Sequence, residues 1–539
     1  MNNKTKFILY ENDNQFSYEK NNKNIQIRFN RVAFIFFVFF IISLIYLIHL
    51  IHLGSRSANY TNDNNSKIYN KLKRADIVDR NGNFLAKTVS SIDIGINPIE
   101  IIDQKKLLLN LSIIFPNKDY QSIQSKFNRN KFFWFEKKIS EQNFEKIMML
   151  GDKSIKPEEK LIRVYPQKNL FSHIIGQIDN ENNGISGLEK SFDKNLKDLN
   201  QNLKLTVDLN LQYLIREELI KFQKIFNSIG SAAILMDSKN GEILSLLSLP
   251  DYDLNKRQLL EDKNLINRAT KGVYELGSVF KTFTYAAGLN EGVIDPDTEF
   301  INLEKKIYCS KFPIGEYDNK IPSDLTAEQI LIRSGNIGSV RIGQKVGIER
   351  FKFFLENIGV LNKIEFDIEE VGQPIPFRWG KCKLATSSFG HGITTTPLQL
   401  AKGYAIITNG GYDIKPTLIK KNYLETKVKN KILDDSVSKK INPILRKIVS
   451  TKEGTAEFAN ISGYEVGGKT GTAQKSIDGI YSKDKVNTFV AVFPTSNPKF
   501  VLTVLLDEPK PNKEYVYNYR DGRNPYKGNR KVYVCMGNS

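Results

Sequence analysis

Residues 32–53 form an unbroken apolar run of 22 positions that contains no Lys, Arg, Asp or Glu. At about 1.5 Å per residue, a helix of this length crosses the roughly 30 Å hydrocarbon layer of a bilayer. The run is long and bulky, and it lacks the small-residue cleavage site that ends a secretory signal peptide. The sequence therefore predicts an uncleaved transmembrane helix rather than a removed signal or a core helix of a soluble domain.

The charges on either side of this helix predict its orientation. Residues 32–53 are followed by a polar stretch with a single nearby cation, Arg56, whereas six basic residues precede the run: Lys4, Lys6, Lys20, Lys23, Arg28 and Arg31. The short loop that is richer in Lys and Arg stays in the cytoplasm. We therefore expect residues 1–31 to be a cytoplasmic tail, and everything after the helix to lie outside the cytoplasm. His49 and His52, at the outer end, are interpreted as interfacial residues and not as ligands.

The composition of the chain excludes several classes of function for the exported part. Of 539 residues, 40% are hydrophobic, which excludes a mainly disordered chain and indicates more than one domain. The net charge of +19 is spread along the chain, so it indicates compositional bias rather than a nucleic-acid surface. Three cysteines and four histidines exclude a disulfide scaffold and a Cys-rich metal site, and they disfavour a His-based zinc enzyme or a Ser-His-Asp hydrolase. Cys309 and Cys382 could pair or remain two free, buried thiols.

The exported part divides by pattern into three segments. Residues 54–73 read as a polar linker, 74–225 as a non-catalytic α+β pedestal domain and 226–539 as a larger α+β domain. Within the pedestal, Asn81-Gly82 predicts a turn between two strands, and residues 100–150 a helical region with Ser140 as an N-cap. The charged residues Asp79, Arg80, Arg163 and Glu189 are interpreted as structural ion pairs of this domain and not as catalytic groups. In the larger domain, strands are expected at 230–249, 464–474, 487–494 and 500–507, with helices between them, including one at 396–411 with Thr396 as its N-cap. This order predicts one sheet completed from both ends of the segment.

Ser278 and Lys281 carry the first chemical signal. A serine three residues before a lysine at a helix start brings hydroxyl and amine within reach of each other. Serine becomes a nucleophile only when a base takes its proton, and lysine is a base only when its pKa is lowered by burial or by a nearby cation. Alone the signal is weak, because Ser-x-x-Lys occurs six times in this chain, starting at Ser17, Ser191, Ser278, Ser436, Ser482 and Ser496.

Two later elements single out Ser278. Ser334-Gly335-Asn336 lies 56 residues on, and Lys469-Thr470-Gly471-Thr472 follows 135 residues after that, as the only Lys-Thr-Gly in the chain. The trio in this order is the pattern of penicillin-binding proteins and class A β-lactamases.

With these motifs, the chain resembles a class B penicillin-binding protein, most closely the division-specific, FtsI type of peptidoglycan D,D-transpeptidase. The resemblance extends over nearly everything after residue 30, including the blocks at 79–82, 206–212, 236–255 and 389–401. It implies a transmembrane helix, an elongated pedestal (dimerisation-type) domain and a penicillin-binding transpeptidase domain with a central antiparallel sheet flanked by helices. It also implies septal cross-linking of stem peptides, with the D-Ala-D-Ala donor held as a serine acyl-enzyme, and covalent inhibition by β-lactams.

The resemblance assigns roles to individual residues. Ser278 would attack the penultimate D-Ala, Lys281 would take its proton, and Ser334 would relay a proton to the leaving amine. Asn336 would hold the substrate amide and help orient Lys281, and Lys469 would favour neutral Lys281 and attract the substrate carboxylate. Three residues, Thr470, Gly471 and Thr472, would bind substrate, and the backbone N–H groups of Ser278 and Thr472 would form the oxyanion hole. No cofactor and no metal is expected.

The implied setting is the bacterial inner membrane, with the catalytic domain in the periplasm. Expected partners are stem peptides, β-lactams, the membrane, an FtsW-type polytopic glycan polymerase and other division proteins, and no nucleic acid. The alternatives are an elongation-specific class B enzyme, a β-lactam sensor or hydrolase, and a catalytically idle division scaffold.

Two departures from the family pattern affect these expectations. Many relatives have Pro at the position of Leu276 and Ser or Asp at that of Gly335, and Gly335 is expected to loosen the loop that positions its neighbours. After Pro509, relatives continue into a Gly-Trp-containing stretch and a C-terminal helix, whereas residues 519–539 here show no amphipathic helix. We therefore expect either a transpeptidase domain that is shortened at its C-terminus, by truncation or a frameshift, or a sheet that is covered differently. If the helix is missing, an exposed apolar sheet face and poor stability are expected.

Overall fold

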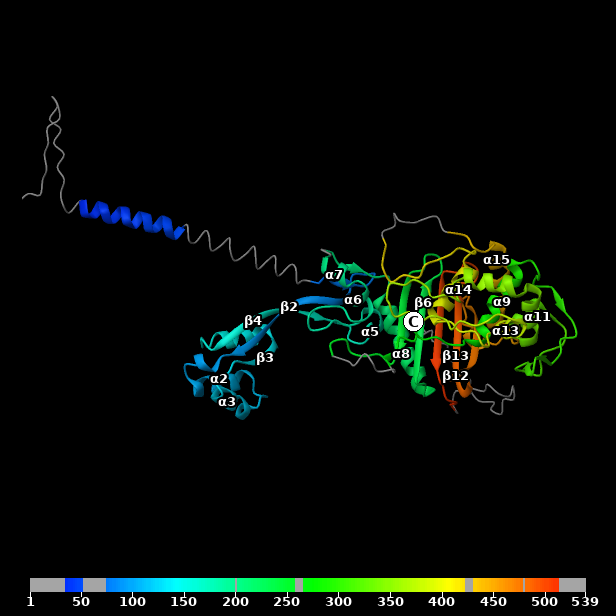
Figure 1. Cartoon of the computed structure of the whole chain (residues 1–539), viewed down its shortest axis with the longest axis horizontal. Helices are drawn as coiled ribbons and strands as arrows, with labels where there is room; N and C mark the ends of the chain where they lie inside the picture. Colours follow the sequence, from blue (N-terminus) through cyan, green and yellow to red (C-terminus); the bar gives the residue numbers. More distant parts are fainter. Residues whose placement is uncertain are drawn as a thin grey trace, which may run out of the picture. The chain divides into compact units, whose positions relative to one another are not determined.

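The computed structural model describes residues 34–51, 74–198, 201–256, 265–421, 430–477 and 480–512. The chain divides into two units, residues 1–73 and 74–539. In the first unit, Phe34–Ile51 form an exposed helix of 18 residues with a mean hydropathy of 2.8, drawn in dark blue in Figure 1. This helix is long and apolar enough to cross a membrane, within the predicted run.

The pedestal is built on a twisted sheet. Its strands run in the order β3-β2-β1-β5, and β4 pairs with β2. Their bounds are β1 (Ile77–Val78), β2 (Phe84–Ile96), β3 (Phe133–Ile139), β4 (Ile155–Val164) and β5 (Leu203–Lys204). The predicted turn at Asn81-Gly82 lies between β1 and β2, and Gly82 has a φ of 95°, which glycine adopts without strain.

Helices cover the outer end of this sheet around a small core of their own. Ile94, Leu111, Phe127 and Ile147 lie in it, all at most 1% exposed. The helices are η1 (Pro98–Glu100), α2 (Gln104–Ile114), α3 (Tyr120–Asn128) and α4 (Glu141–Met148). Ser140 caps α4 by accepting a hydrogen bond from the Asn143 N–H, as predicted. The expected helical region is interrupted by β3, because its alternate residues pack against this core.

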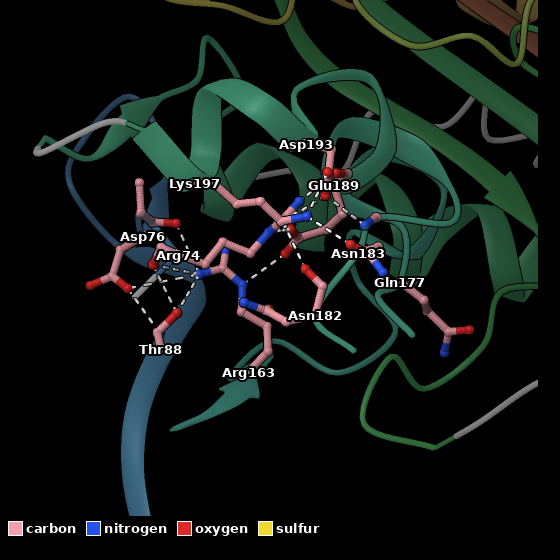
Figure 2. A network of polar contacts seen from close by, with 12 residues as sticks. Arg74, Asp76, Thr88, Arg163, Gln177, Asn182, Asn183, Glu189, Asp193 and Lys197 are labelled. Carbon is pink, nitrogen blue, oxygen red and sulfur yellow. Dashed lines mark hydrogen bonds and ion pairs between the residues drawn. The ribbon is translucent and has the colours of Figure 1, made fainter. Parts of the chain in front are cut away.

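A buried ion-pair network joins Arg74, which precedes β1, to the short helices α6 (Gly187–Ser191) and α7 (Asp193–Asp198) (Figure 2). The short helix α5 (Ser172–Ile175) comes before them in the chain. Glu189 accepts from Arg74 at 2.5 Å and from Arg163 at 2.8 Å, and all three side chains are at most 1% exposed. The prediction that Arg163 and Glu189 are structural is thus supported, while Arg74 was missed. Asp79, also predicted to be ion-paired, instead accepts hydrogen bonds from the backbone of Asn81, Asn83 and Leu209.

The second domain contains a five-stranded antiparallel sheet in the order β12-β13-β14-β6-β7. Its strands are β6 (Gly230–Asp237), β7 (Ile243–Leu249), β12 (Gly467–Ile477), β13 (Ile480–Phe493) and β14 (Phe500–Asp507). The first two strands therefore meet the last three across the β6–β14 pair, and the predicted sheet completed from both ends is confirmed. The alternation of side chains gives this sheet two buried faces.

Helices flank both faces, in agreement with the predicted α+β class (Figure 1). On one face, Leu219 of α8 (Leu209–Ile225) packs with Ala233 and Leu247. On the other, Ile234 and Val490 join the main core with Phe283 of α9 (Lys281–Asn290) and Tyr404 of α14 (Pro397–Thr408). Thr396 caps α14 in a capping box with Gln399, as expected for that helix. Residues 513–539, where the shortened C-terminus was predicted, lie outside the described residues.

The remaining helices and short strands belong to the second domain. They are η3 (Gly277–Phe280), β8 (Glu299–Phe300), β9 (Lys306–Cys309), β10 (Phe312–Gly315), β11 (Leu325–Thr326), α10 (Ala327–Ile332), α11 (Asn336–Val346), α12 (Ile348–Asn357), α13 (Lys381–Ser387), α15 (Asp435–Ser450) and η5 (Glu457–Ala459). Cys309 and Cys382 form a disulfide, which ties the β9–β10 hairpin to α13. This resolves the alternative left open by the sequence in favour of pairing.

Candidate active site

Ser278 lies in a tight turn that is pressed against strand β12. The turn η3 leads directly into α9, and its first residue, Gly277, has a φ of 63°. A Cβ on Gly277 would lie 2.3 Å from the Thr472 carbonyl oxygen, and one on Gly471 would lie 2.2 Å from that of Leu276. Both contacts need glycine, so these two residues allow the serine turn to touch the Lys-Thr-Gly-Thr strand.

Ser334 links the two predicted lysines. Lys281 Nζ donates to the Ser334 carbonyl at 2.5 Å and lies 3.1 Å from its hydroxyl oxygen, while Lys469 Nζ lies 2.9 Å from the same hydroxyl. Lys281, Ser334 and Lys469 are 1%, 3% and 0% exposed. The three motifs, which span residues 278–472 of the sequence, therefore meet at one buried hydroxyl.

The backbone of Ser334 is held in an unusual conformation. Its φ of 58° lies in the left-handed region, which a residue other than glycine rarely occupies. Such strain persists only where the surrounding contacts determine it, and it is common at functional sites. Here it directs both the carbonyl and the hydroxyl of Ser334 to Lys281.

Burial sets the charge of the two amines. It lowers the pKa of Lys281 to about 7, against an opposing effect of the Glu316 carboxylate. Burial, and then the nearby Lys281, lowers the pKa of Lys469 well below its ordinary range. Because the two amines contact one hydroxyl, they titrate as a pair, and a proton on one disfavours a proton on the other. Near neutral pH the pair therefore offers a free amine next to Ser278.

Glu316 fixes the Ser-Gly-Asn motif. Gly335 is the N-cap of α11 and has no side chain to satisfy the first N–H groups of the helix. The Glu316 carboxylate takes that place, accepting from the N–H of Asn336 at 2.6 Å and of Ile337 at 2.9 Å. The loosening expected from Gly335 is thus countered by a carboxylate at the positive end of the helix dipole.

Asn336 is turned toward the β9–β10 hairpin. Its side-chain amide donates to the Gly315 carbonyl at 2.7 Å. Among the described residues, no hydrogen bond joins it to Lys281, so its predicted effect on Lys281 stays a prediction.

The predicted substrate-binding residues lie on an edge strand. Among the strands that the structure describes, β12 pairs with β13 alone, so its other edge presents backbone groups that an extended peptide can bind. Thr470 and Gly471 follow Lys469 on this strand, and the Thr470 hydroxyl lies 2.9 Å from that of Thr455. Thr472 touches the serine turn through its backbone.

A second polar group beside the serine turn was missed by sequence reasoning. Glu275 accepts from the Tyr481 hydroxyl at 3.0 Å and from the Gly392 N–H at 2.9 Å, and lies 3.7 Å from His391 Nδ1. The only sequence signal was the position of Glu275, three residues before Ser278. Within the described residues, no three His, Cys, Asp or Glu side chains gather closely enough to hold a metal ion.

Comparison with known proteins agrees with this geometry. The family described as "Penicillin binding protein transpeptidase domain" matches residues 231–522, more than half of the chain. The chain belongs to the penicillin-binding transpeptidase family. A second family, "Penicillin-binding Protein dimerisation domain", matches residues 69–218, which cover the pedestal.

Individual relatives are similar over most of their length. The chain is 30% identical to "Probable peptidoglycan D,D-transpeptidase FtsI" of Caulobacter vibrioides, over 81% of this chain and 76% of that protein. It is 29% identical to "Stage V sporulation protein D" of Bacillus subtilis, over 81% and 74%. It is 30% identical to "Peptidoglycan D,D-transpeptidase FtsI" of Buchnera aphidicola, over 82% and 84%. The chain is therefore a class B penicillin-binding protein of the FtsI type and a serine-type D,D-transpeptidase, with peptidoglycan as substrate and β-lactams as ligands.

Proposed function

We propose that this transpeptidase acts at the division septum and that Ser278 is its acylated residue. The observation that carries the catalytic proposal is the shared contact of Lys281 and Lys469 with the Ser334 hydroxyl, beside the Ser278 turn. Two FtsI-named relatives support the septal role, although a sporulation protein is almost as similar.

In the first half-reaction, Ser278 Oγ attacks the carbonyl of the penultimate D-Ala while Lys281 takes its proton. The N–H groups of Ser278 and Thr472 stabilise the oxyanion. Ser334, in contact with both lysines, relays a proton to the nitrogen of the terminal D-Ala, and the C–N bond breaks. Asn336 holds the substrate amide.

The substrate itself sets the protonation of the lysine pair. Its terminal carboxylate binds near Lys469, Thr470 and Thr472, where a negative charge raises the affinity of Lys469 for a proton. The pair shares one proton through Ser334, so a proton held on Lys469 leaves Lys281 neutral and able to act as the base. In the second half-reaction, an amine of another stem peptide attacks the ester and forms the cross-link.

Variants of the full chain in detergent test these roles. Ser278→Ala abolishes labelling by a fluorescent penicillin, whereas Lys281→Ala and Lys469→Ala slow it by about 10²–10⁴-fold, the range of general base catalysis. Ser436→Ala is the matched control, because this exposed serine has the same Ser-x-x-Lys spacing and lies at the start of α15. Labelling that survives Ser278→Ala would disprove the assignment.

We also propose a cytoplasmic N-terminus, a periplasmic catalytic domain in the inner membrane and an FtsW-type polymerase as partner. The charge asymmetry around the helix of residues 34–51 supports this orientation. Depleting the protein in its source bacterium tests the role: filaments that lack septa are expected, and rounded or widened cells would indicate elongation instead. Rapid hydrolysis of bound penicillin would indicate a hydrolase, and no labelling a scaffold.

A further inference from the structure

A histidine is stacked between two aromatic rings next to the serine turn. The His391 ring lies 4.6 Å from that of Tyr481 at an interplanar angle of 24°, and 5.9 Å from that of Phe389 at 11°. The stack holds the plane of the imidazole, and 39% of the side chain remains exposed. The orientation of the His391 ring is therefore fixed by its neighbours, although the first half-reaction does not use this residue.

Backbone contacts place His391 beside the acylation site. A Cβ on Gly390 would lie 1.9 Å from the carbonyl oxygen of Gly277, so the residue before His391 touches the residue before Ser278. Tyr481 comes from the end of the β12–β13 hairpin, opposite Ser476 and four residues beyond Thr472 along the pair of strands. The stack thus lies between the nucleophile turn and the tip of the hairpin, in a different cluster from Lys281, Ser334 and Lys469.

Glu275 favours the form of His391 that can accept a proton. Its carboxylate faces His391 Nδ1 at 3.7 Å and is 10% exposed. A carboxylate on this side favours the tautomer with hydrogen on Nδ1, which leaves the lone pair of Nε2 free to accept a proton. The hydroxyl of Tyr481 and the N–H of Gly392 hold the carboxylate in place.

Burial keeps the imidazole of His391 neutral. Burial is the largest effect and lowers the pKa of His391, the Glu275 carboxylate opposes it, and the Lys383 ammonium adds a smaller lowering effect. Lys383 of α13 is itself fixed, since it donates to the Gly392 carbonyl and lies over the Phe377 ring at 4.0 Å. The imidazole is therefore unprotonated at neutral pH, as a general base must be.

We propose that His391, oriented by Glu275, is the general base that deprotonates the acceptor amine in the second half-reaction. The ligand class is a primary aliphatic amine of an acceptor stem peptide. Its nitrogen forms a bond to the ester carbonyl, its proton passes to His391 Nε2, and the bond between that carbon and Ser278 Oγ breaks. Ser278 takes a proton from the Lys281–Ser334–Lys469 group, which recovers one from solvent as His391 releases its own. This inference rests on the proposed acylation of Ser278.

The test separates the two half-reactions. The full chain in detergent is given a thioester analogue of the donor peptide and an amino-acid amide as acceptor, and the amide and hydrolysis products are quantified. His391→Gly is expected to lower the ratio of amide to hydrolysis product at least tenfold, and added imidazole, which fits the space between Phe389 and Tyr481, is expected to restore it. Glu275→Gln is expected to shift the pH dependence of this ratio to lower pH.

The outcomes are distinct. If the ratio in His391→Gly equals that of the wild type, or if imidazole does not restore a lowered ratio, the proposal is overturned. An effect on donor KM alone would also overturn it, because it would assign His391 to donor binding. If no acyl-enzyme forms in the wild type, the proposed acylation of Ser278 fails instead, and this is seen separately as the absence of both products.

Discussion

Lys469 Nζ lies 2.9 Å from the Ser334 hydroxyl, although 135 residues separate them in the sequence. Lys281 Nζ lies 3.1 Å from the same hydroxyl oxygen. Two buried amines on one hydroxyl cannot both be charged without a large electrostatic cost. This arrangement is the basis of our proposal that Lys281 is the base for Ser278 and that Ser334 passes a proton to the leaving group.

The first prediction concerns pH. Because the pKa of Lys281 is about 7, its amine is protonated in acid and cannot accept the Ser278 proton. The second-order rate constant of acylation by a penicillin should fall about tenfold per pH unit below about pH 7 and level off above it. Stopped-flow measurements from pH 5 to 9 would show this; a rate that is flat across the range contradicts it.

The second prediction concerns Glu316. Glu316→Gln weakens the cap of α11, and we expect slower acylation and a loss of about 1 kcal/mol in the free energy of unfolding. Because the Glu316 carboxylate raises the pKa of Lys281, the acid limb of the pH profile should also move to lower pH. Glu304→Gln, in an exposed pair with Arg341, is the control. It should leave the acylation rate, the free energy of unfolding and the acid limb unchanged. If the acid limb does not move, Glu316 has no effect on the titration of Lys281, which contradicts this prediction.

The third prediction concerns the buried network of Figure 2. Glu189→Ala leaves the guanidinium groups of Arg74 and Arg163 buried without their shared carboxylate, and we expect a loss of about 3–5 kcal/mol. Glu369→Ala removes an exposed partner of Lys190 and should cost at most about 1 kcal/mol. Urea unfolding followed by the fluorescence of Trp134, in the pedestal, compares the two variants. Equal losses of unfolding free energy in the two variants would contradict the claim that burial makes the Glu189 pairs more costly to break than the exposed pair.

The fourth prediction concerns the disulfide. It closes a loop with a sequence separation of 73 residues, and loop entropy gives it about 4 kcal/mol of stability. The double variant Cys309→Ser, Cys382→Ser should lose stability of this order and acylate more slowly, since the hairpin that it anchors leads to Glu316. Cys535→Ser should have no effect. A reductant that destabilises the double variant as much as the wild type would show that another bond is responsible.

Local patterns made part of this structure predictable. The caps Ser140 and Thr396, the turn at Gly82 and the three motifs each depend on a few neighbouring residues, and the structure has them where the sequence indicates. Glu316, Glu275 and Arg74 were missed because their importance comes from partners that only the fold brings near. The pairing of Cys309 with Cys382 depends in the same way on the packing of a hairpin against α13.

The break in the predicted helical region has a similar cause. Residues 133–139 carry aromatic and charged side chains that suit either a helix or a strand. Pairing with β2 makes these residues a strand, because Phe135 then packs in the same hydrophobic core as Phe127. Tertiary context overrides local propensity at such positions.

The central claim is that Ser278 is the nucleophile of an assembled transpeptidase site. Its most direct test is to treat the full chain with penicillin and to map the adduct by tandem mass spectrometry of its peptides. The account predicts one adduct per chain, on Ser278, that persists for many minutes. An adduct on another residue, or none on a folded sample, would contradict it.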